Sequence, residues 1–144
     1  LFSNLAAFLV VATASDALGG DSLEAYNGLS QRSPLLAAAL FIGLLSLAGV
    51  PPLAGFVGKL LVLLAATASG RLWLVTVGAL NVAISLYYYL MVIRRMYLLP
   101  PTASRPVAVD GLTRAPLFFL VAGILLLGIF QEPFLRQISL AVRP

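Results

Sequence analysis

Four long stretches of this sequence carry almost no charge, and they limit what the chain can fold into. Residues 1–15, 72–93 and 115–131 contain no Asp, Glu, Lys or Arg, and residues 33–70 contain Lys59 alone. In the whole chain 61% of residues are hydrophobic and 10% are charged, whereas roughly 25% are charged in an ordinary soluble domain. Uncharged runs of this length are typical of membrane-spanning helices. We therefore expect an all-α, polytopic transmembrane helix bundle.

The charged segments between these runs predict where the spans begin and end. We expect one membrane domain over residues 1–144, with spans at about 1–15, 34–69, 72–96 and 115–135 and polar loops at 16–33 and 97–114. The first run reaches only about 22 Å as a helix, short of the ~30 Å hydrocarbon core. We therefore interpret it as the end of a truncated helix, and the chain as a fragment of a longer protein.

The run from 33 to 70 is too long for one regular span, because a helix of that length measures about 57 Å. It is interrupted by a segment that contains Gly49, Pro51, Pro52 and Gly55. Proline removes a backbone donor and clashes with the preceding turn, and glycine adopts dihedral angles that other residues avoid. Two arrangements are open: a hairpin of two short helices, or one discontinuous span made of two half-helices. Either places the break inside a bundle, since lipid leaves unpaired backbone groups unsatisfied.

The arginines favour the discontinuous span. If residues 34–69 cross the membrane once, one side holds Arg32, Arg94, Arg95, Arg105 and Arg114, and the other holds Arg71, Arg136 and Arg143. A hairpin would instead divide the arginines equally between the two sides. Because cytoplasmic loops carry an excess of basic residues, the unequal distribution is the expected one.

Lys59 is the only ionisable residue between Arg32 and Arg71. An ammonium group deep in a bilayer costs roughly 2.5–3.5 kcal/mol on insertion scales, so this side chain should face the bundle interior or water. Desolvation disfavours the charged form of lysine, and a proton-exchanging lysine needs this property. The alternative is a structural lysine that extends to the membrane interface or pairs with a carboxylate.

Two other features have a functional and a structural interpretation. Asn81 and Ser85 lie four residues apart, so they share a helix face that either packs against another helix or lines a hydrated path. The Gly/Pro break either serves packing alone or exposes half-helix ends that hold ions and water, as in transporters.

Several classes of chemistry are excluded by the residues that the chain lacks. It contains no Cys and no His, which excludes thiol catalysis, disulfide bonds and nearly every zinc or haem site within it. No phosphate-binding glycine loop follows a strand pattern, and the arginines do not form one basic face, so nucleic acid is not an expected partner. The net charge of +4 is explained by arginines that set membrane topology.

Two segments resemble the antiporter-like membrane subunits of respiratory complex I. They are Leu44–Lys59, with the sequence LLSLAGVPPLAGFVGK, and Ser85–Tyr97, with the sequence SLYYYLMVIRRMY. The tyrosine-rich segment is most similar to subunit N, also called chain 2. Shorter matches are Asn4–Phe8 and Tyr26–Pro34.

This resemblance implies a bundle of about fourteen spans built from two inverted repeats, of which the chain forms the C-terminal part. Such subunits couple NADH:quinone electron transfer, which occurs in other subunits, to proton pumping along a mid-membrane relay of charged residues. Lys59 matches the relay lysine on the discontinuous helix. The residues that match its break are Gly49, Pro51, Pro52 and Gly55.

The same resemblance implies the surroundings of the chain. NADH, FMN, iron–sulfur clusters and quinone are expected in other subunits, and neither a cofactor nor a metal is expected here. The expected partners are other membrane subunits of complex I and the lipid bilayer, and the chain is not expected to function alone. The expected location is the bacterial cytoplasmic membrane, with mitochondrial and thylakoid membranes as alternatives. The alternative functions are a related subunit of a multi-subunit sodium/proton antiporter or membrane-bound hydrogenase, and a passive membrane scaffold.

Overall fold

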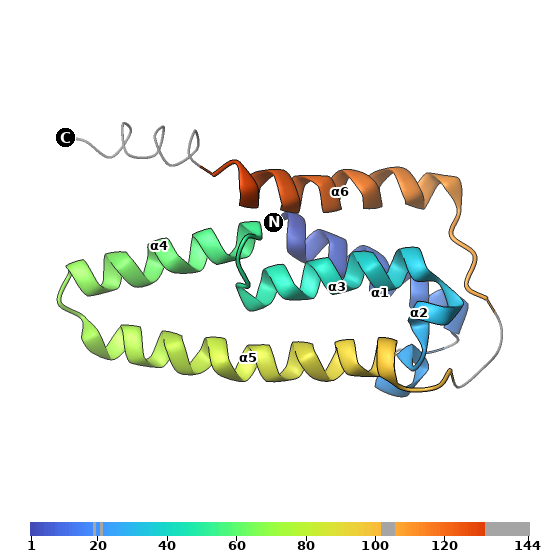
Figure 1. Cartoon of the computed structure of the whole chain (residues 1–144), viewed down its shortest axis with the longest axis horizontal. Coiled ribbons are helices and arrows are strands. Elements are labelled where there is room, and N and C mark those ends of the chain that lie inside the picture. The colour runs from blue at the N-terminus through green and yellow to red at the C-terminus, as the bar shows by residue number, and fades with distance from the viewer. Residues whose placement is uncertain (19, 21, 102–105, 132–144) are drawn as a thin grey trace.

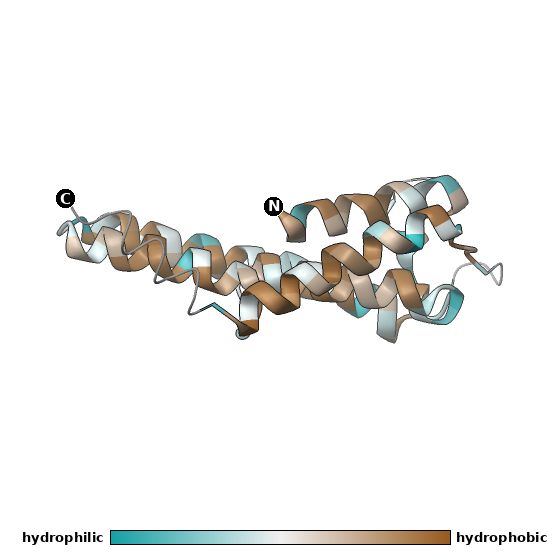
Figure 2. Cartoon of the chain, turned by 90° about the horizontal axis from the view of Figure 1, so that it is seen from above, coloured by the Kyte–Doolittle hydropathy of each residue, from teal (hydrophilic) through white to brown (hydrophobic). Residues whose placement is uncertain are grey.

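The molecule is a bundle of helices that run along one long axis (Figure 1). The computed structural model describes residues 1–18, 20, 22–101 and 106–131. Its elements are α1 (Phe2–Leu18), η1 (Leu23–Tyr26), α2 (Leu29–Arg32), α3 (Pro34–Ala48), α4 (Ala54–Ala68), α5 (Leu72–Leu98) and α6 (Gly111–Ile129). Hydrophobic residues occupy most of the length of the long helices (Figure 2). The expected all-α class is confirmed.

The core of the bundle lies around α3. This helix contacts five other helices, α1, α2, α4, α5 and α6, and its buried side includes Leu36, Leu40 and Leu44. A helix that is apolar all round is expected in the interior of a protein. In contrast, α4 contributes no buried residue and α5 contributes only Met96. Among the described residues, α5 and α6 are long and apolar enough to cross a membrane, and α1, α3 and α4 are shorter apolar helices.

The two helices on either side of the Gly/Pro segment follow one another in the same direction, and α5 runs back along both (Figure 1). Just before α2, which precedes α3, the Gly28 N–H donates to the Arg95 carbonyl at 3.0 Å and so joins this end of the bundle to the end of α5. Arg71 lies at the opposite end, in the turn between α4 and α5. This arrangement favours one discontinuous helix over a hairpin. That it crosses a membrane stays a prediction.

The segment 16–33, which we predicted to be a polar loop, contains the end of α1 and two short helices. Helices as short as η1 and α2 are not stable alone. Here α2 is held from both sides, because Gly28 donates to Arg95 and the Val107 N–H donates to the Arg32 carbonyl at 3.1 Å. These bonds come from residues far away in the sequence, so the local pattern did not predict them.

The segment 97–114 is also more helical than predicted, because α5 continues to Leu98 and α6 begins at Gly111. The Asp110 carbonyl accepts the N–H groups of Thr113 and Arg114 at 3.0 and 3.1 Å, which closes the first turn of α6 before the predicted start at 115. The predicted end of this last span, at 135, lies outside the described residues. So do Arg105, Arg136 and Arg143.

Candidate functional site

The segment between α3 and α4 contains Gly49, Pro51 and Pro52, which the sequence analysis assigns to a helical break. Gly49 has φ = +86° at the end of α3, and its N–H donates to the carbonyls of Leu45 and Ser46 at 3.1 and 3.0 Å. A left-handed glycine with these bonds ends a helix, because the chain then turns away from the helix axis. Pro51 and Pro52 follow, and α4 begins at Ala54. Gly55 lies in the first turn of α4.

The side chain of Lys59 extends from α4 across this break to the end of α3. It belongs to α4, and its Nζ donates to the carbonyl oxygens of Leu47 at 2.6 Å and Ala48 at 3.1 Å, both in the last turn of α3. The last carbonyls of a helix have no partner within the helix. They also carry the negative end of the helix dipole, which attracts a cation. Lys59 is therefore the polar cap of the first half-helix.

The two glycines of the break leave room for close contacts. A Cβ atom on Gly49 would lie 2.9 Å from the Cδ of Lys59, so a side chain there would displace the lysine. A Cβ atom on Gly55 would overlap the carbonyl oxygen of Ser46. Each glycine thus allows α4 and its lysine to approach the end of α3.

A pair of serines joins three helices at the same place. Ser3 on α1 and Ser46 on α3 share a hydrogen bond of 2.7 Å between their hydroxyl groups, and Ser46 Oγ accepts the N–H of Gly55 on α4 at 3.1 Å. Neither serine is among the site residues expected from the sequence. Ser46 is the only polar side chain in α3, which is a detectable signal, but nothing in the local sequence identifies Ser3 as its partner.

Lys59 also lines a cavity of about 280 Å³ between α4 and α5. Its polar lining side chains are Lys59, Asn81 and Ser85, and the rest of its lining is Gly58, Val62, Leu63, Gly78 and Val82. The two residues that share a face of α5 therefore lie beside the lysine of α4. Their role, in packing or in a hydrated path, stays a prediction.

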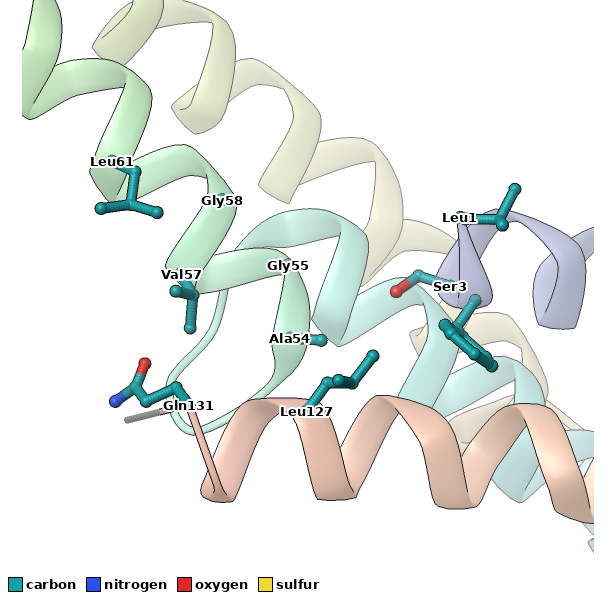
Figure 3. A pocket seen from close by; sticks show the side chains of 10 residues that line it. Leu1, Ser3, Ala54, Gly55, Val57, Gly58, Leu61, Leu127 and Gln131 are labelled. Carbon is teal, nitrogen blue, oxygen red and sulfur yellow. The ribbon is translucent and has the colours of Figure 1, made fainter. Parts of the chain in front are cut away.

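A larger cavity of about 550 Å³ lies on another side of α4, and its lining includes Ser3, Gly55, Gly58, Leu127 and Gln131 (Figure 3). Gly58 lines both cavities. The second half-helix is thus flanked by open space at the level of the break.

The groups at the break can bind water and exchange a proton with it. Lys59 is the one ionisable group among the described residues there, and the surrounding partners are backbone carbonyls, serine hydroxyls and the amide of Asn81. Such groups hold a proton or water. In the described part of the chain, no three His, Cys, Asp or Glu side chains are grouped to hold a metal ion.

The fold and the site define a bundle of apolar helices, in which two short helices meet at a break that holds a lysine. Residues 1–85 match the family described as "NADH:quinone oxidoreductase/Mrp antiporter, TM". The chain belongs to this family and is an integral membrane protein.

Three known proteins give the extent of the similarity. NADH-quinone oxidoreductase subunit N of Heliobacterium modesticaldum is 40% identical over 141 residues, which cover 98% of this chain and 30% of that protein. A chain of the membrane-bound sulfane sulfur reductase, an archaeal respiratory membrane complex, matches with a TM-score of 0.87 at 26% identity, over 97% of this chain and 28% of that one. A chain of respiratory complex I from Thermus thermophilus matches with a TM-score of 0.74 at 31% identity, over 91% and 32%.

These matches confirm the resemblance to antiporter-like subunits of complex I. They also set its extent, because the chain spans 30% of the subunit N relative and 28% and 32% of the two matched chains of solved structures.

Proposed function

We propose that the protein is a proton-translocating membrane subunit of NADH-quinone oxidoreductase and that Lys59 is one member of its proton relay. The observation that carries this proposal is the position of Lys59, which binds the free carbonyls of α3 and also borders a cavity with Asn81 and Ser85. The similarity to subunit N supports the same assignment. In this proposal, NADH, FMN, iron–sulfur clusters and quinone bind other subunits, which are the partners of the chain.

The geometry suggests how Lys59 takes part. The carbonyls of Leu47 and Ala48 stabilise the ammonium form, because they accept hydrogen bonds from its N–H groups and lie at the negative end of a helix dipole. The cavity next to Lys59 is large enough for several waters, and Asn81 and Ser85 supply hydrogen-bond partners for them. A proton passed from water to Lys59, and later back to water, requires no other reactive group in this part of the chain.

The membrane arrangement is part of the proposal. We place spans at about 1–15, 34–69, 72–96 and 115–135, with α3 and α4 as the two halves of one broken span. The apolar surface of α4 and α5, which includes Val62, Trp73 and Leu80, then faces lipid or neighbouring subunits. The membrane in question is the bacterial cytoplasmic membrane, which the bacterial origin of the subunit N relative supports.

The test compares two substitutions of Lys59 in the full-length protein assembled in its membrane complex. Lys59→Ala removes the charge and the proton. Lys59→Arg keeps a cation that donates to the carbonyls of Leu47 and Ala48, but arginine does not release its proton at working pH. We expect both variants to oxidise NADH in an assembled complex, and both to lose the proton translocation that depends on this subunit.

A matched control is Arg71→Ala, since Arg71 is an exposed cation in the turn after α4 and away from the break. Proton translocation by this variant should equal that of the native complex. Normal translocation by Lys59→Arg would contradict the relay and would favour a passive scaffold in which Lys59 supplies only charge.

The match to the sulfane sulfur reductase favours a second candidate, a related subunit of another ion-translocating redox complex. Affinity purification of the full-length protein, followed by identification of the proteins that accompany it, distinguishes the two. NADH-quinone oxidoreductase subunits in the purified complex support the first candidate. A complex without them, driven by another electron donor, supports the second.

A further inference from the structure

Ser3 and Ser46 are two polar side chains in the buried part of an apolar helix bundle. Ser46 is fully buried and Ser3 is 8% exposed. A buried hydroxyl without a partner is costly, so the two serines are stable there because each satisfies the other at 2.7 Å. The pair connects α1 to the last turn of α3.

Ser46 also supplies a cap that α4 lacks. The first N–H groups of a helix have no partner within it, and the residue before the helix commonly provides a side-chain acceptor. The residue in that position is Leu53, which makes no such bond. The N–H of Gly55 is instead accepted by Ser46 Oγ at 3.1 Å, from the other half-helix.

The Gly55–Ser46 bond and the two bonds of Lys59 all join α4 to the last turn of α3 across the break. Gly55 and Lys59 lie one turn apart on α4, and therefore on the same side of it. Gly55 binds the side chain of Ser46, and Lys59 binds the carbonyls of the next two residues, Leu47 and Ala48. A rotation or shift of α4 that broke the first contact would also move Lys59 away from its carbonyls.

We infer that Ser46 is a positioning residue for Lys59, and that Ser3 fixes the hydroxyl of Ser46 in the orientation that Gly55 requires. This inference rests on the proposed function of Lys59. Removal of the Ser46 hydroxyl leaves the N–H of Gly55 and the hydroxyl of Ser3 without their partner, so α4 is no longer held in register with α3. Lys59 then exchanges protons from a less defined position.

The experiment measures the Lys59-dependent rate of proton translocation, defined as the rate of the native complex minus the rate of the Lys59→Ala complex. We expect Ser46→Ala to lower this rate roughly five- to tenfold while the rate of NADH oxidation stays normal. Loss of one buried hydrogen bond changes an equilibrium constant by about this factor. Ser46→Thr, which keeps a hydroxyl, should restore most of it. Because a purely structural role would alter assembly and heat stability alone, loss of translocation in an assembled complex is the distinguishing result.

The matched control is Thr13→Val. Thr13 lies on α1 like Ser3, and within the described residues its hydroxyl bonds to the Leu9 carbonyl of its own helix at 2.8 Å. Ser3→Ala should lower the Lys59-dependent rate about two- to threefold, since Ser46 keeps its bond to Gly55, whereas Thr13→Val should leave it unchanged.

Two failures have different meanings. If Lys59→Ala translocates protons like the native complex, the proposed function is wrong whatever the serine variants do. If Lys59→Ala loses translocation and Ser46→Ala retains it, the positioning role of Ser46 alone is wrong. Should Ser46→Ala fail to assemble, Ser3→Ala decides, and a rate equal to that of Thr13→Val overturns the inference.

Discussion

The side-chain nitrogen of Lys59 lies 2.6 Å from the carbonyl oxygen of Leu47, although the two residues belong to different helices. Lys59 is therefore both the ionisable group of the site and a contact between α4 and α3 across the break. A change in the protonation of Lys59 therefore alters the contact that holds α4 to the end of α3. The break and the lysine form one structural unit, and substitutions of either should affect both.

Gly49→Ala should destabilise the break. The left-handed conformation of Gly49, with φ = +86°, costs about 1–2 kcal/mol for a residue with a Cβ atom, and this atom would also lie 2.9 Å from Lys59 Cδ. We expect a lower temperature of thermal inactivation in the full-length protein in its complex, together with reduced proton translocation. Gly111→Ala is the control, because a Cβ there meets no atom of the other described residues within 4 Å, apart from its chain neighbours and its own helix backbone. An equal thermal shift in the two variants would contradict this account.

The part of the site that could be predicted from the sequence depends on local chemistry. Gly49, Pro51 and Pro52 disfavour a continuous helix, and Lys59 is the single charged residue in an apolar run. The contact of Lys59 with Leu47 and Ala48, by contrast, depends on how closely the start of α4 packs against the end of α3. That distance follows from tertiary packing and could not be inferred from spacing.

The serine pair and the short helices cannot be predicted from local sequence for the same physical reason. Ser46 finds its hydroxyl partner on α1, forty-three residues earlier in the chain. Likewise α2 is stabilised by bonds from Arg95 and Val107. The four-residue spacing of Asn81 and Ser85 predicts that they share one face of α5, but only the packing of α4 on α5 brings them beside Lys59.

The direction of the broken helix predicts which side of the membrane each end reaches. If α3 and α4 cross once, cysteines introduced as Gln31→Cys and Arg94→Cys should react with an impermeant maleimide from one side, and Arg71→Cys from the other. All three positions are exposed, and any native cysteines of the full-length protein are first replaced. Labelling in sealed vesicles of both orientations measures this. Labelling of Gln31→Cys and Arg71→Cys from the same side would indicate a hairpin.

Asn81 and Ser85 should matter for translocation if the cavity beside Lys59 holds water. The double substitution Asn81→Leu with Ser85→Ala removes both polar partners on α5 and makes the cavity apolar, which disfavours water there. We expect the Lys59-dependent rate of proton translocation to fall roughly two- to tenfold, with assembly unchanged.

The control for this change is Thr76→Val on the same helix, because the Thr76 hydroxyl bonds to the Leu72 carbonyl at 3.2 Å and lies outside the cavity. If the double variant translocates protons as fast as Thr76→Val, the two polar residues serve packing, and water reaches Lys59 by another path.

Gly128 on α6 is expected to be less tolerant of a side chain than Gly123 on the same helix. A Cβ at Gly128 would overlap the carbonyl oxygen of Pro52, in the backbone of the break, whereas a Cβ at Gly123 would meet the ring of Phe2. The ring can turn aside at the end of its side chain, but the backbone between two packed helices cannot, and overpacking of this kind costs about 1–3 kcal/mol. Gly128→Ala should therefore lower the thermal stability of the full-length protein in its complex more than Gly123→Ala does. Thermal inactivation of the two variants side by side measures this, and a greater loss for Gly123→Ala would show that α6 packs against the N-terminal helix more tightly than against the break.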